Sequence, residues 1–284
     1  MTFVETALTG VVQGALLTPQ APTGLGVVVL GGSSGAIDLE RAGLFASRGA
    51  TVIAQRWFGG PGQSPGICEI PLETFTAAID RLTAEGCERI AYIGTSKGAE
   101  AALLVAAHDP RVEVVIALSP SSVVWANSGP GADGYEWPHR SSFTWRGAPF
   151  AFVPHTAEAL LSIRRIPPIG YLDLHLGSLS TFADRLEAAA IPIERARATV
   201  VLVAGGDDAL WPSLHFAEAL DQRLADHGKR AILVAHPEAG HRTLLPGETK
   251  ARSALNAHGG HDAADRALGQ AAWTQIARLL DLAD

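Results

Sequence analysis

The feature that most constrains the fold is a regular alternation of short apolar runs and longer amphipathic stretches. The apolar runs are nearly continuous and rich in Val, Ile and Ala, which is typical of strands buried on both faces of a parallel sheet. They lie at Gly26–Leu30, Thr51–Ala54, Arg89–Ile93, Val112–Leu118, Thr199–Ala204 and Arg230–Ala235. Stretches with a helical period separate or follow them, at Asp38–Ser47, Leu72–Glu85, Lys97–His108, Leu214–Ala225 and Ala263–Leu282. This alternation predicts an α/β fold with a mostly parallel, doubly wound sheet.

Two segments depart from the alternation. The first twenty residues read as a short antiparallel hairpin that would extend one sheet edge. From residue 119 to about 192 no strand is evident, and the segment is rich in Gly, Pro, Ser and aromatic residues. A stretch of this length without regular structure is uncommon in a compact domain unless it has a role. Its aromatic residues favour a lid or a pocket wall over a plain surface excursion; they are Trp125, Trp137, Trp145, Phe150 and Phe152. We expect one domain over residues 1–284.

Composition excludes several classes of function. The formal charge is −7 and no cluster of Lys and Arg occurs, so nucleic acid and anionic membrane surfaces are poor candidate partners. No apolar run approaches the roughly 18 residues that a membrane span needs. The N-terminus lacks a basic segment followed by an apolar one, so a cytoplasmic location is the expectation. The two cysteines, Cys68 and Cys87, show no metal-ligand spacing, and neither a metal nor another cofactor is expected.

The pentapeptide Gly94-Thr95-Ser96-Lys97-Gly98 carries the strongest chemical signal. It follows the apolar run that ends at Ile93 and precedes a helical stretch, as a G-x-S-x-G nucleophile turn requires. Such a turn is sharp and strained, and it exposes the serine at the N-terminus of a helix. The alternative is an ordinary helix-capping serine followed by a glycine. Because both flanking elements are present, we favour Ser96 as a nucleophile.

A serine nucleophile needs a base and a group that orients that base, here expected in the chain order serine, acid, histidine. The run Thr199–Ala204 is followed by two adjacent aspartates, of which we choose Asp208 and keep Asp207 in reserve. The last apolar run leads to His241, which follows a glycine, with His236 as the second candidate. Each of these residues follows a strand, and the strands are predicted to end at the same edge of the sheet. The sequence therefore predicts a Ser-His-Asp triad at Ser96, His241 and Asp208.

The same edge should supply donors for an oxyanion and walls for a pocket. The backbone N–H of Lys97, which follows the nucleophile, is one expected donor, and the glycine-rich loop after Leu30 should provide the second, for which we name Ser33. That loop could instead be a simple turn into the next helix. Trp57, Phe58 and Trp211 follow strands at this edge and are expected to line an acyl pocket, or otherwise to be core.

These motifs together resemble the catalytic domain shared by acyl-CoA thioesterases and the bile acid-CoA:amino acid N-acyltransferases, relatives of the dienelactone hydrolases within the α/β-hydrolase superfamily. The resembling segments include LGGSSGAIDLERAGLFASRGATVIAQRWFG, IGTSKGAEAALL, FTWRGAPFAFVP, AAIPIERARATVVLVAGGDDALWPS and HPEAGH, and they follow the order of that family from about residue 25 onward. The resemblance implies a Ser/Cys–Asp–His triad and acyl transfer from a thioester. Members that transfer acyl groups to an amine resemble one another in having cysteine as the nucleophile, whereas Ser96 favours hydrolysis by water.

The expected function is therefore a serine hydrolase that cleaves a small-molecule acyl thioester, or an ester, through an acyl-enzyme. The alternatives are a carboxylesterase or dienelactone-type lactone hydrolase, an acyltransferase or cyclase in a biosynthetic pathway, and a binding protein that keeps the pocket without the chemistry. The sequence indicates neither the acyl group nor the oligomeric state.

Overall fold

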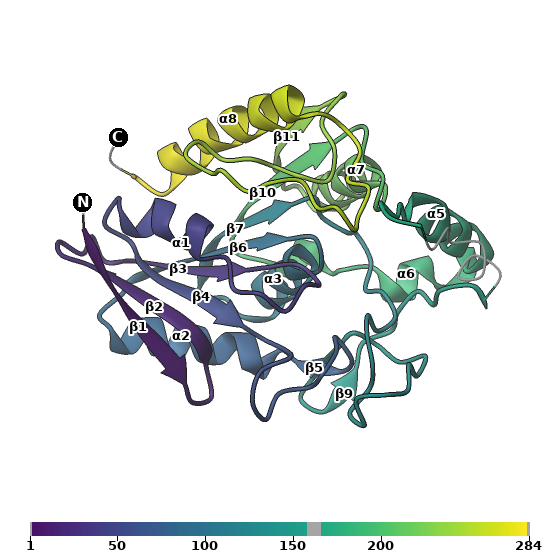
Figure 1. The fold of residues 1–284 in the computed structure, drawn as a ribbon, viewed down its shortest axis with the longest axis horizontal. Coiled ribbons are helices and arrows are strands. Elements are labelled where there is room, and N and C mark those ends of the chain that lie inside the picture. The colour runs from purple at the N-terminus through teal and green to yellow at the C-terminus, as the bar shows by residue number, and fades with distance from the viewer. Residues whose placement is uncertain (1, 158–165, 283–284) are drawn as a thin grey trace.

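A central sheet with helices on both faces dominates the computed structural model, which describes residues 2–157 and 166–282 (Figure 1). Within those residues the sheet has eight strands in the order β1-β2-β4-β3-β6-β7-β10-β11. Their bounds are β1 Phe3–Thr9, β2 Gln13–Pro19, β3 Leu25–Leu30, β4 Thr51–Arg56, β6 Arg89–Thr95, β7 Val112–Leu118, β10 Thr199–Gly205 and β11 Ile232–His236. The β1–β2 hairpin and the β2–β4 pair are antiparallel, and the other neighbours are parallel. The chain thus has an α/β-hydrolase fold of the doubly wound type, as predicted.

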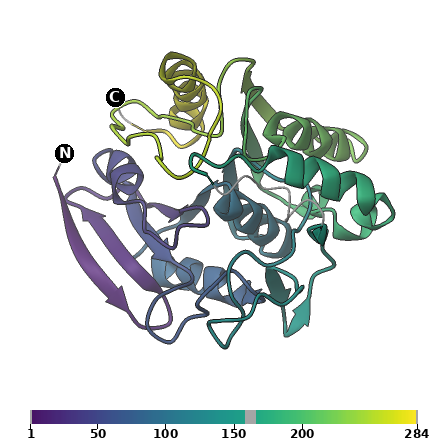
Figure 2. The same ribbon diagram turned by 45° about the vertical axis from the view of Figure 1, so that its right-hand side comes forward.

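Two helical layers cover the sheet. One face packs against α1 (Leu39–Ala46) and α8 (Asp262–Leu279), and the other against α2 (Glu73–Ala84), α3 (Lys97–His108) and α7 (Ser213–Ala225). Figure 2 shows both layers from a second direction. The central strands β3, β6, β7 and β10 are buried almost throughout, which explains their continuous apolar sequence.

The predicted elements match the structure closely. Every predicted core strand is present, with ends that differ by at most two residues, and the N-terminal hairpin does extend one edge of the sheet. The helix predicted over Lys97–His108 has those bounds, and α8 ends at Leu279, three residues before the predicted end.

The expectation that no strand lies between residues 119 and 192 is wrong. Strands β8 (Phe143–Trp145) and β9 (Ala148–Pro149) pair there, and β8 also pairs with β5 (Ile70–Pro71). The segment further contains α5 (Leu172–Thr181), α6 (Leu186–Ala189) and the 3-10 turn η1 (Ala183–Arg185), and the 3-10 turn η2 (Ile193–Arg195) follows it directly. Strands of two or three residues are too short to show a period in the sequence, and the partner strand β5 lies far away along the chain. The segment is an insertion between β7 and β10.

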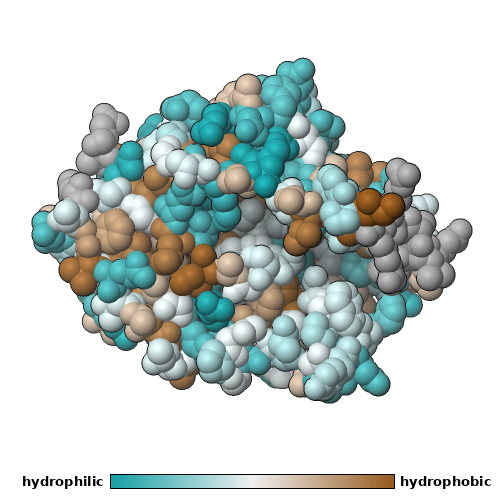
Figure 3. All heavy atoms as spheres, in the orientation of Figure 1, coloured by the Kyte–Doolittle hydropathy of each residue, from teal (hydrophilic) through white to brown (hydrophobic). Residues whose placement is uncertain are grey.

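Parallel pairing brings the carboxyl ends of β3, β6, β7, β10 and β11 to one edge of the sheet. Residues that follow these strands therefore gather there even when they are distant in sequence. Figure 3 shows hydrophilic and hydrophobic side chains interspersed over the face seen in Figure 1. Among the described helices, none combines the length and the apolar character that a membrane crossing requires.

Candidate active site

Ser96 occupies a strained turn between β6 and α3. Its φ and ψ are 57° and −120°, a combination that a residue other than glycine rarely adopts. Holding such a backbone costs about 1–3 kcal/mol, and structures retain it mainly where the surroundings enforce it. Here the Ser96 N–H donates to the Leu118 carbonyl at 2.9 Å, and the Ser96 carbonyl accepts the N–H groups of Ala99 and Glu100. The sharp turn predicted from G-x-S-x-G is therefore present.

The two glycines of the pentapeptide are required by close packing. A Cβ on Gly94 would run into the backbone carbonyl of Gly98. A Cβ on Gly98 would meet the carbonyl of Gly31 and would lie 2.7 Å from that of Leu30. Only glycine fits at either position, so the turn is pressed against the end of β3.

That contact also brings the glycine-rich loop after β3 to the nucleophile. A Cβ built on Gly32 would lie 3.4 Å from the Ser96 Cβ, and Ser33 and Lys97 line the same cavity as Ser96. The predicted pocket residues Trp57 and Phe58 lie elsewhere, outside the residues that line this cavity. Trp57 donates its indole N–H to the Gly31 carbonyl at 3.3 Å, and the Phe58 ring packs against Gly35. Both therefore support the loop from the core side.

Asp208 and His241 form a buried pair. The Oδ2 of Asp208 lies 2.7 Å from the Nδ1 of His241, and both side chains are almost inaccessible to solvent. The Oδ1 of Asp208 accepts the backbone N–H groups of Leu210 and Trp211 at 2.8 and 3.2 Å, which fixes the carboxylate. The Asp208 carboxylate can only accept a hydrogen bond, so the Nδ1 of His241 carries the proton that it donates. In the neutral imidazole, Nε2 then has a free lone pair. Among the described residues, this buried Nε2 has no hydrogen-bond partner.

The alternatives to these two residues have local roles. Asp207 accepts the Gly260 N–H at 2.9 Å through Oδ2, and His236 accepts the Glu238 N–H at 3.2 Å through Nδ1. Both contacts stabilise turns and leave Asp207 and His236 outside the Asp208–His241 pair.

Ser119, directly after β7, connects the loops that follow the other strands through hydrogen bonds. The Ser119 hydroxyl donates to the His241 carbonyl at 2.8 Å, and the indole N–H of Trp211 donates to the Ser119 carbonyl at 3.2 Å. The preceding residue, Leu118, accepts the N–H of Ser96. The loops of Ser96, Asp208 and His241 thus share one hydrogen-bonded support.

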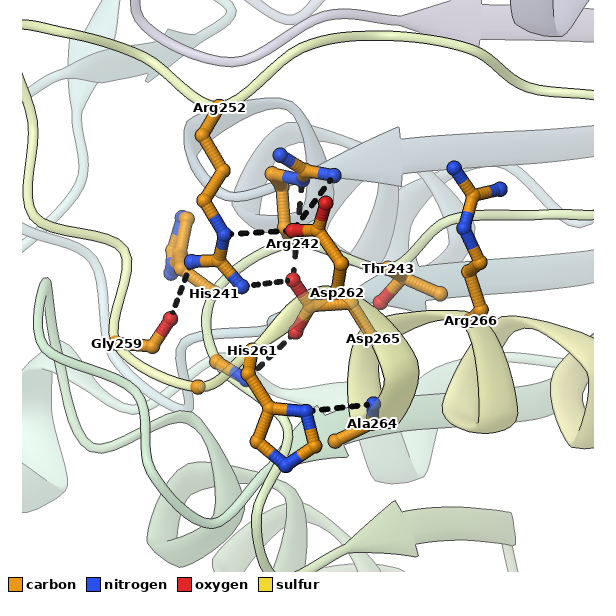
Figure 4. A network of polar contacts seen from close by, with 12 residues as sticks. His241, Arg242, Thr243, Arg252, Gly259, His261, Asp262, Ala264, Asp265 and Arg266 are labelled. Carbon is orange, nitrogen blue, oxygen red and sulfur yellow. Dashed lines mark hydrogen bonds and ion pairs between the residues drawn. The ribbon is translucent and has the colours of Figure 1, made fainter.

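A network of charged residues that the sequence did not suggest holds the His241 loop from behind (Figure 4). Asp265 is fully buried near the start of α8, and its Oδ1 accepts the Gly240 N–H at 2.9 Å. Arg252 donates to Asp265 Oδ2 at 2.8 Å, to Asp262 at 2.7 Å and to the Gly259 carbonyl at 2.7 Å. Burial raises the pKa of the Asp265 carboxyl. These contacts join the loop before His241 to the segment at Gly259, which forms a bridge with Asp208.

Arg41 connects the nucleophile turn with the same loop. Its buried guanidinium forms a bidentate pair with Glu248, at 2.7 and 2.9 Å. It also donates to the Thr95 hydroxyl at 2.6 Å and to the Thr243 carbonyl at 3.0 Å. Thr95 precedes Ser96 and Thr243 follows His241 by two residues, so one side chain couples both loops.

The side chain of Lys97 anchors the insertion. Its Nζ lies 2.6 Å from Glu100 Oε2 and 2.8 Å from the Ser142 hydroxyl, and Glu100 Oε1 accepts the Trp125 N–H at 3.1 Å. Burial lowers the pKa of Lys97 and raises that of Glu100, while the attraction between the two charges opposes both changes.

A cavity of about 690 Å³ opens above these residues. The residues that line it include, from the strand ends, Ser33, Ser96, Lys97, Leu210 and Trp211, and from the insertion Trp125, Asn127, Trp137, His139, His155, Tyr171 and His175. The insertion therefore forms a large part of the pocket wall, and Trp211, after β10, also lines the cavity. Within the described residues, no group of three or more His, Cys, Asp or Glu is arranged to hold a metal ion.

Comparison with known proteins shows the family of this chain. The family model for the BAAT / acyl-CoA thioester hydrolase C-terminal domain matches residues 70–281. The chain belongs to this family. Among the curated proteins similar to this BAAT-type chain is human acyl-coenzyme A thioesterase 1, 25% identical over 258 residues, which cover 89% of this chain and 57% of the relative. Another is acyl-coenzyme A amino acid N-acyltransferase 2 of Rattus norvegicus, 27% identical over 241 residues, which cover 82% of this chain and 52% of the relative.

The BAAT-type chain thus spans about half the length of these curated relatives. Solved structures resemble it in fold. A putative dienelactone hydrolase from Klebsiella pneumoniae has a TM-score of 0.56 at 15% identity, with 98% of each chain covered. A carboxyl esterase from Bacillus coagulans has a TM-score of 0.55 at 14% identity, with 99% of this chain and 98% of the esterase covered. These likenesses show that the BAAT-type chain shares the α/β-hydrolase fold.

Proposed function

We propose that this chain is a serine hydrolase that cleaves acyl thioesters, of the acyl-CoA kind, through an acyl-enzyme on Ser96. The observation that carries the proposal is the strained Ser96 turn beside a cavity, at the sheet edge where the buried Asp208–His241 pair also lies. The substrate class rests on the family and on the names of relatives such as acyl-coenzyme A thioesterase 1.

The residues have distinct roles in the proposed reaction. Asp208 holds His241 in the tautomer with a free Nε2, which takes the proton from the Ser96 hydroxyl as Oγ attacks the thioester carbonyl. The backbone N–H of Lys97 and one from the Ser33 loop donate to the developing oxyanion. His241 then returns the proton to the leaving thiol, and water activated by His241 releases the acid and restores Ser96.

The test is thiol release from a panel of acyl-CoA thioesters by the protein and by its Ser96→Ala variant. Removing a triad nucleophile costs on the order of 10⁴-fold or more in turnover. Ser47→Ala is a matched control, because Ser47 caps α1 and makes its contacts there. Hydrolysis that survives in Ser96→Ala would overturn the proposed mechanism.

Acyl transfer to an amine is a second candidate, because one relative is named an amino acid N-acyltransferase. Serine at position 96 favours water as the acceptor. Product analysis with glycine or taurine present separates the two reactions, since transfer yields an amide in place of the free acid. Matched carboxyl esters and lactones in the same panel test the ester and lactone alternatives.

A further inference from the structure

Two histidines of the insertion line the proposed substrate cavity without belonging to the Asp208–His241 pair. His155 stacks on Trp125, with ring centroids 5.4 Å apart and planes 9° from parallel. His175 meets the same indole edge-on at 4.7 Å, and the two imidazole rings lie 5.6 Å apart. Both histidines line the cavity that contains Ser96.

Hydrogen bonding fixes the tautomer of His175. Its Nδ1 lies 2.8 Å from the carbonyl of Tyr171 and 2.8 Å from that of Leu210. Carbonyl oxygens only accept, so Nδ1 carries the proton and Nε2 keeps a lone pair. This Nε2 makes no hydrogen bond to a described residue, and the His175 side chain lines the cavity.

The opposite tautomer is favoured at His155. Its Nδ1 is enclosed by protein and has no hydrogen-bond partner among the described residues. An enclosed N–H without an acceptor is rarer in proteins than an under-satisfied acceptor, so the proton belongs on Nε2. His155 is then a hydrogen-bond donor and His175 an acceptor, and both side chains line the cavity with their rings 5.6 Å apart.

The charge state of the cavity supports this arrangement. Burial lowers the pKa of His155 to about 3 and that of His175 to about 4, so both rings are neutral near pH 7. Among the described residues that line the cavity, Lys97 supplies the one Lys, Arg, Asp or Glu side chain, and Glu100 neutralises it. A neutral group that both accepts and donates a hydrogen bond matches such a site.

We propose that His155 and His175 bind a hydroxyl group on the acyl part of the substrate, which accepts from His155 Nε2 and donates to His175 Nε2. This inference rests on the proposed hydrolase function and narrows its substrates to hydroxyacyl thioesters. A cavity of about 690 Å³ accommodates an acyl group of drug-like size together with the thioester. His155 and His175 act here as specificity-determining residues.

The experiment compares matched thioesters of N-acetylcysteamine, a leaving group without a hydroxyl. The pairs are phenylacetyl with 4-hydroxyphenylacetyl, hexanoyl with 6-hydroxyhexanoyl, and octanoyl with 3-hydroxyoctanoyl. Two hydrogen bonds to a neutral hydroxyl predict that kcat/KM favours the hydroxylated member of at least one pair about tenfold or more. In His155→Phe, which keeps a ring to stack on Trp125, this ratio should fall to about one.

Two further variants separate recognition from folding. His155→Gln restores a side-chain N–H donor and should recover part of the preference. His108→Phe is the matched control, because His108 is a partly buried histidine packed against Trp145 and Phe150, outside the residues that line the cavity. It should keep the wild-type ratio.

Two results overturn the inference. In one, the kcat/KM values of no pair differ by more than about twofold in the wild-type protein. In the other, His155→Phe keeps the wild-type preference for the hydroxylated member. If pantetheine thioesters are cleaved faster than N-acetylcysteamine thioesters of the same acyl group, and His155→Phe removes that difference while no acyl pair is separated, the bound hydroxyl belongs to the leaving group and the inference is also overturned. The same pairs are measured as 4-nitrophenyl esters. Discrimination among esters without any thioester cleavage would overturn the proposed thioesterase function and leave the hydroxyl site standing.

Discussion

Asp208 contacts His241 through one carboxylate oxygen and two backbone N–H groups through the other, whereas Asp207, its neighbour, points to Gly260. Adjacent residues on one turn face in different directions, so the two carboxylates are separable by mutation. Replacing either one by asparagine retains nearly the same volume and removes the charge.

We expect Asp208→Asn to lower kcat on the order of 10⁴-fold, because an amide that donates at Nδ1 favours the wrong tautomer of the base. Asp207→Asn should change kcat by less than about tenfold, because the amide oxygen of asparagine still accepts the Gly260 N–H and Asp207 has no contact with His241. Steady-state kinetics of the two variants on one substrate shows which of the two aspartates supports catalysis. Equal losses would mean that the pairing with His241 is not the basis of catalysis.

Thr95 gives a second prediction, because its hydroxyl accepts a 2.6 Å hydrogen bond from the buried Arg41. Thr95→Val keeps the shape but leaves one guanidinium N–H without its acceptor, which should lower the free energy of unfolding by about 1–3 kcal/mol. We also expect kcat to fall more than KM changes, since the turn that carries Ser96 loses its connection to the His241 loop. Urea unfolding and kinetics measure the two effects.

Thr95→Ser is the control for that variant, because it restores the hydroxyl. Recovery of both stability and kcat would support the positioning role. If Thr95→Val lost stability but kept its kcat, the contact would be structural only.

The order of strand ends made the central residues predictable. Ser96, Asp208 and His241 each follow an apolar strand, and parallel pairing forces such positions to one sheet edge. The choice between Asp207 and Asp208 depended on turn geometry, which two adjacent aspartates do not reveal in sequence. The catalytic role of these residues stays a prediction.

Contacts between distant segments were beyond the reach of sequence patterns. Arg41 and Glu248 are 207 residues apart, and nothing local marks either as a partner of the site. His155 and His175 lie in the insertion, where no period indicates which side chains turn inward. Trp57 was expected in the pocket or the core; it follows β4, and the direction in which the chain leaves that strand places it in the core.

The buried Lys97–Glu100 pair gives a third prediction. Glu100→Leu would leave the Lys97 ammonium buried without its counter-charge, which typically lowers the free energy of unfolding by about 3–5 kcal/mol. The double variant Lys97→Met/Glu100→Leu should recover most of that loss, because an apolar pair often replaces a buried ion pair at little cost. Denaturant unfolding of both single variants and the double variant yields the coupling energy. If the losses of unfolding free energy in the two single variants add up to that of the double variant, Lys97 and Glu100 do not stabilise each other.

The cavity histidines predict how stability depends on pH. In the folded protein burial lowers the pKa of His155 to about 3 and that of His175 to about 4, against an ordinary value of 6.5. Between pH 6.5 and about 4 the unfolded chain therefore binds protons that the folded protein does not. The free energy of unfolding should fall as the pH is lowered through this range, by at most about 1.4 kcal/mol per pH unit for each histidine.

Carboxylates also begin to titrate at the lower end of that range, so the informative quantity is the difference between wild type and His155→Phe from pH 7 to pH 5. The variant lacks one group that gains a proton on unfolding, and its stability should decline less steeply. Urea unfolding at half-unit pH steps measures the slopes. Parallel curves for wild type and His155→Phe would show that His155 is not held neutral by the fold, and would remove the charge argument for a neutral, hydroxyl-binding cavity.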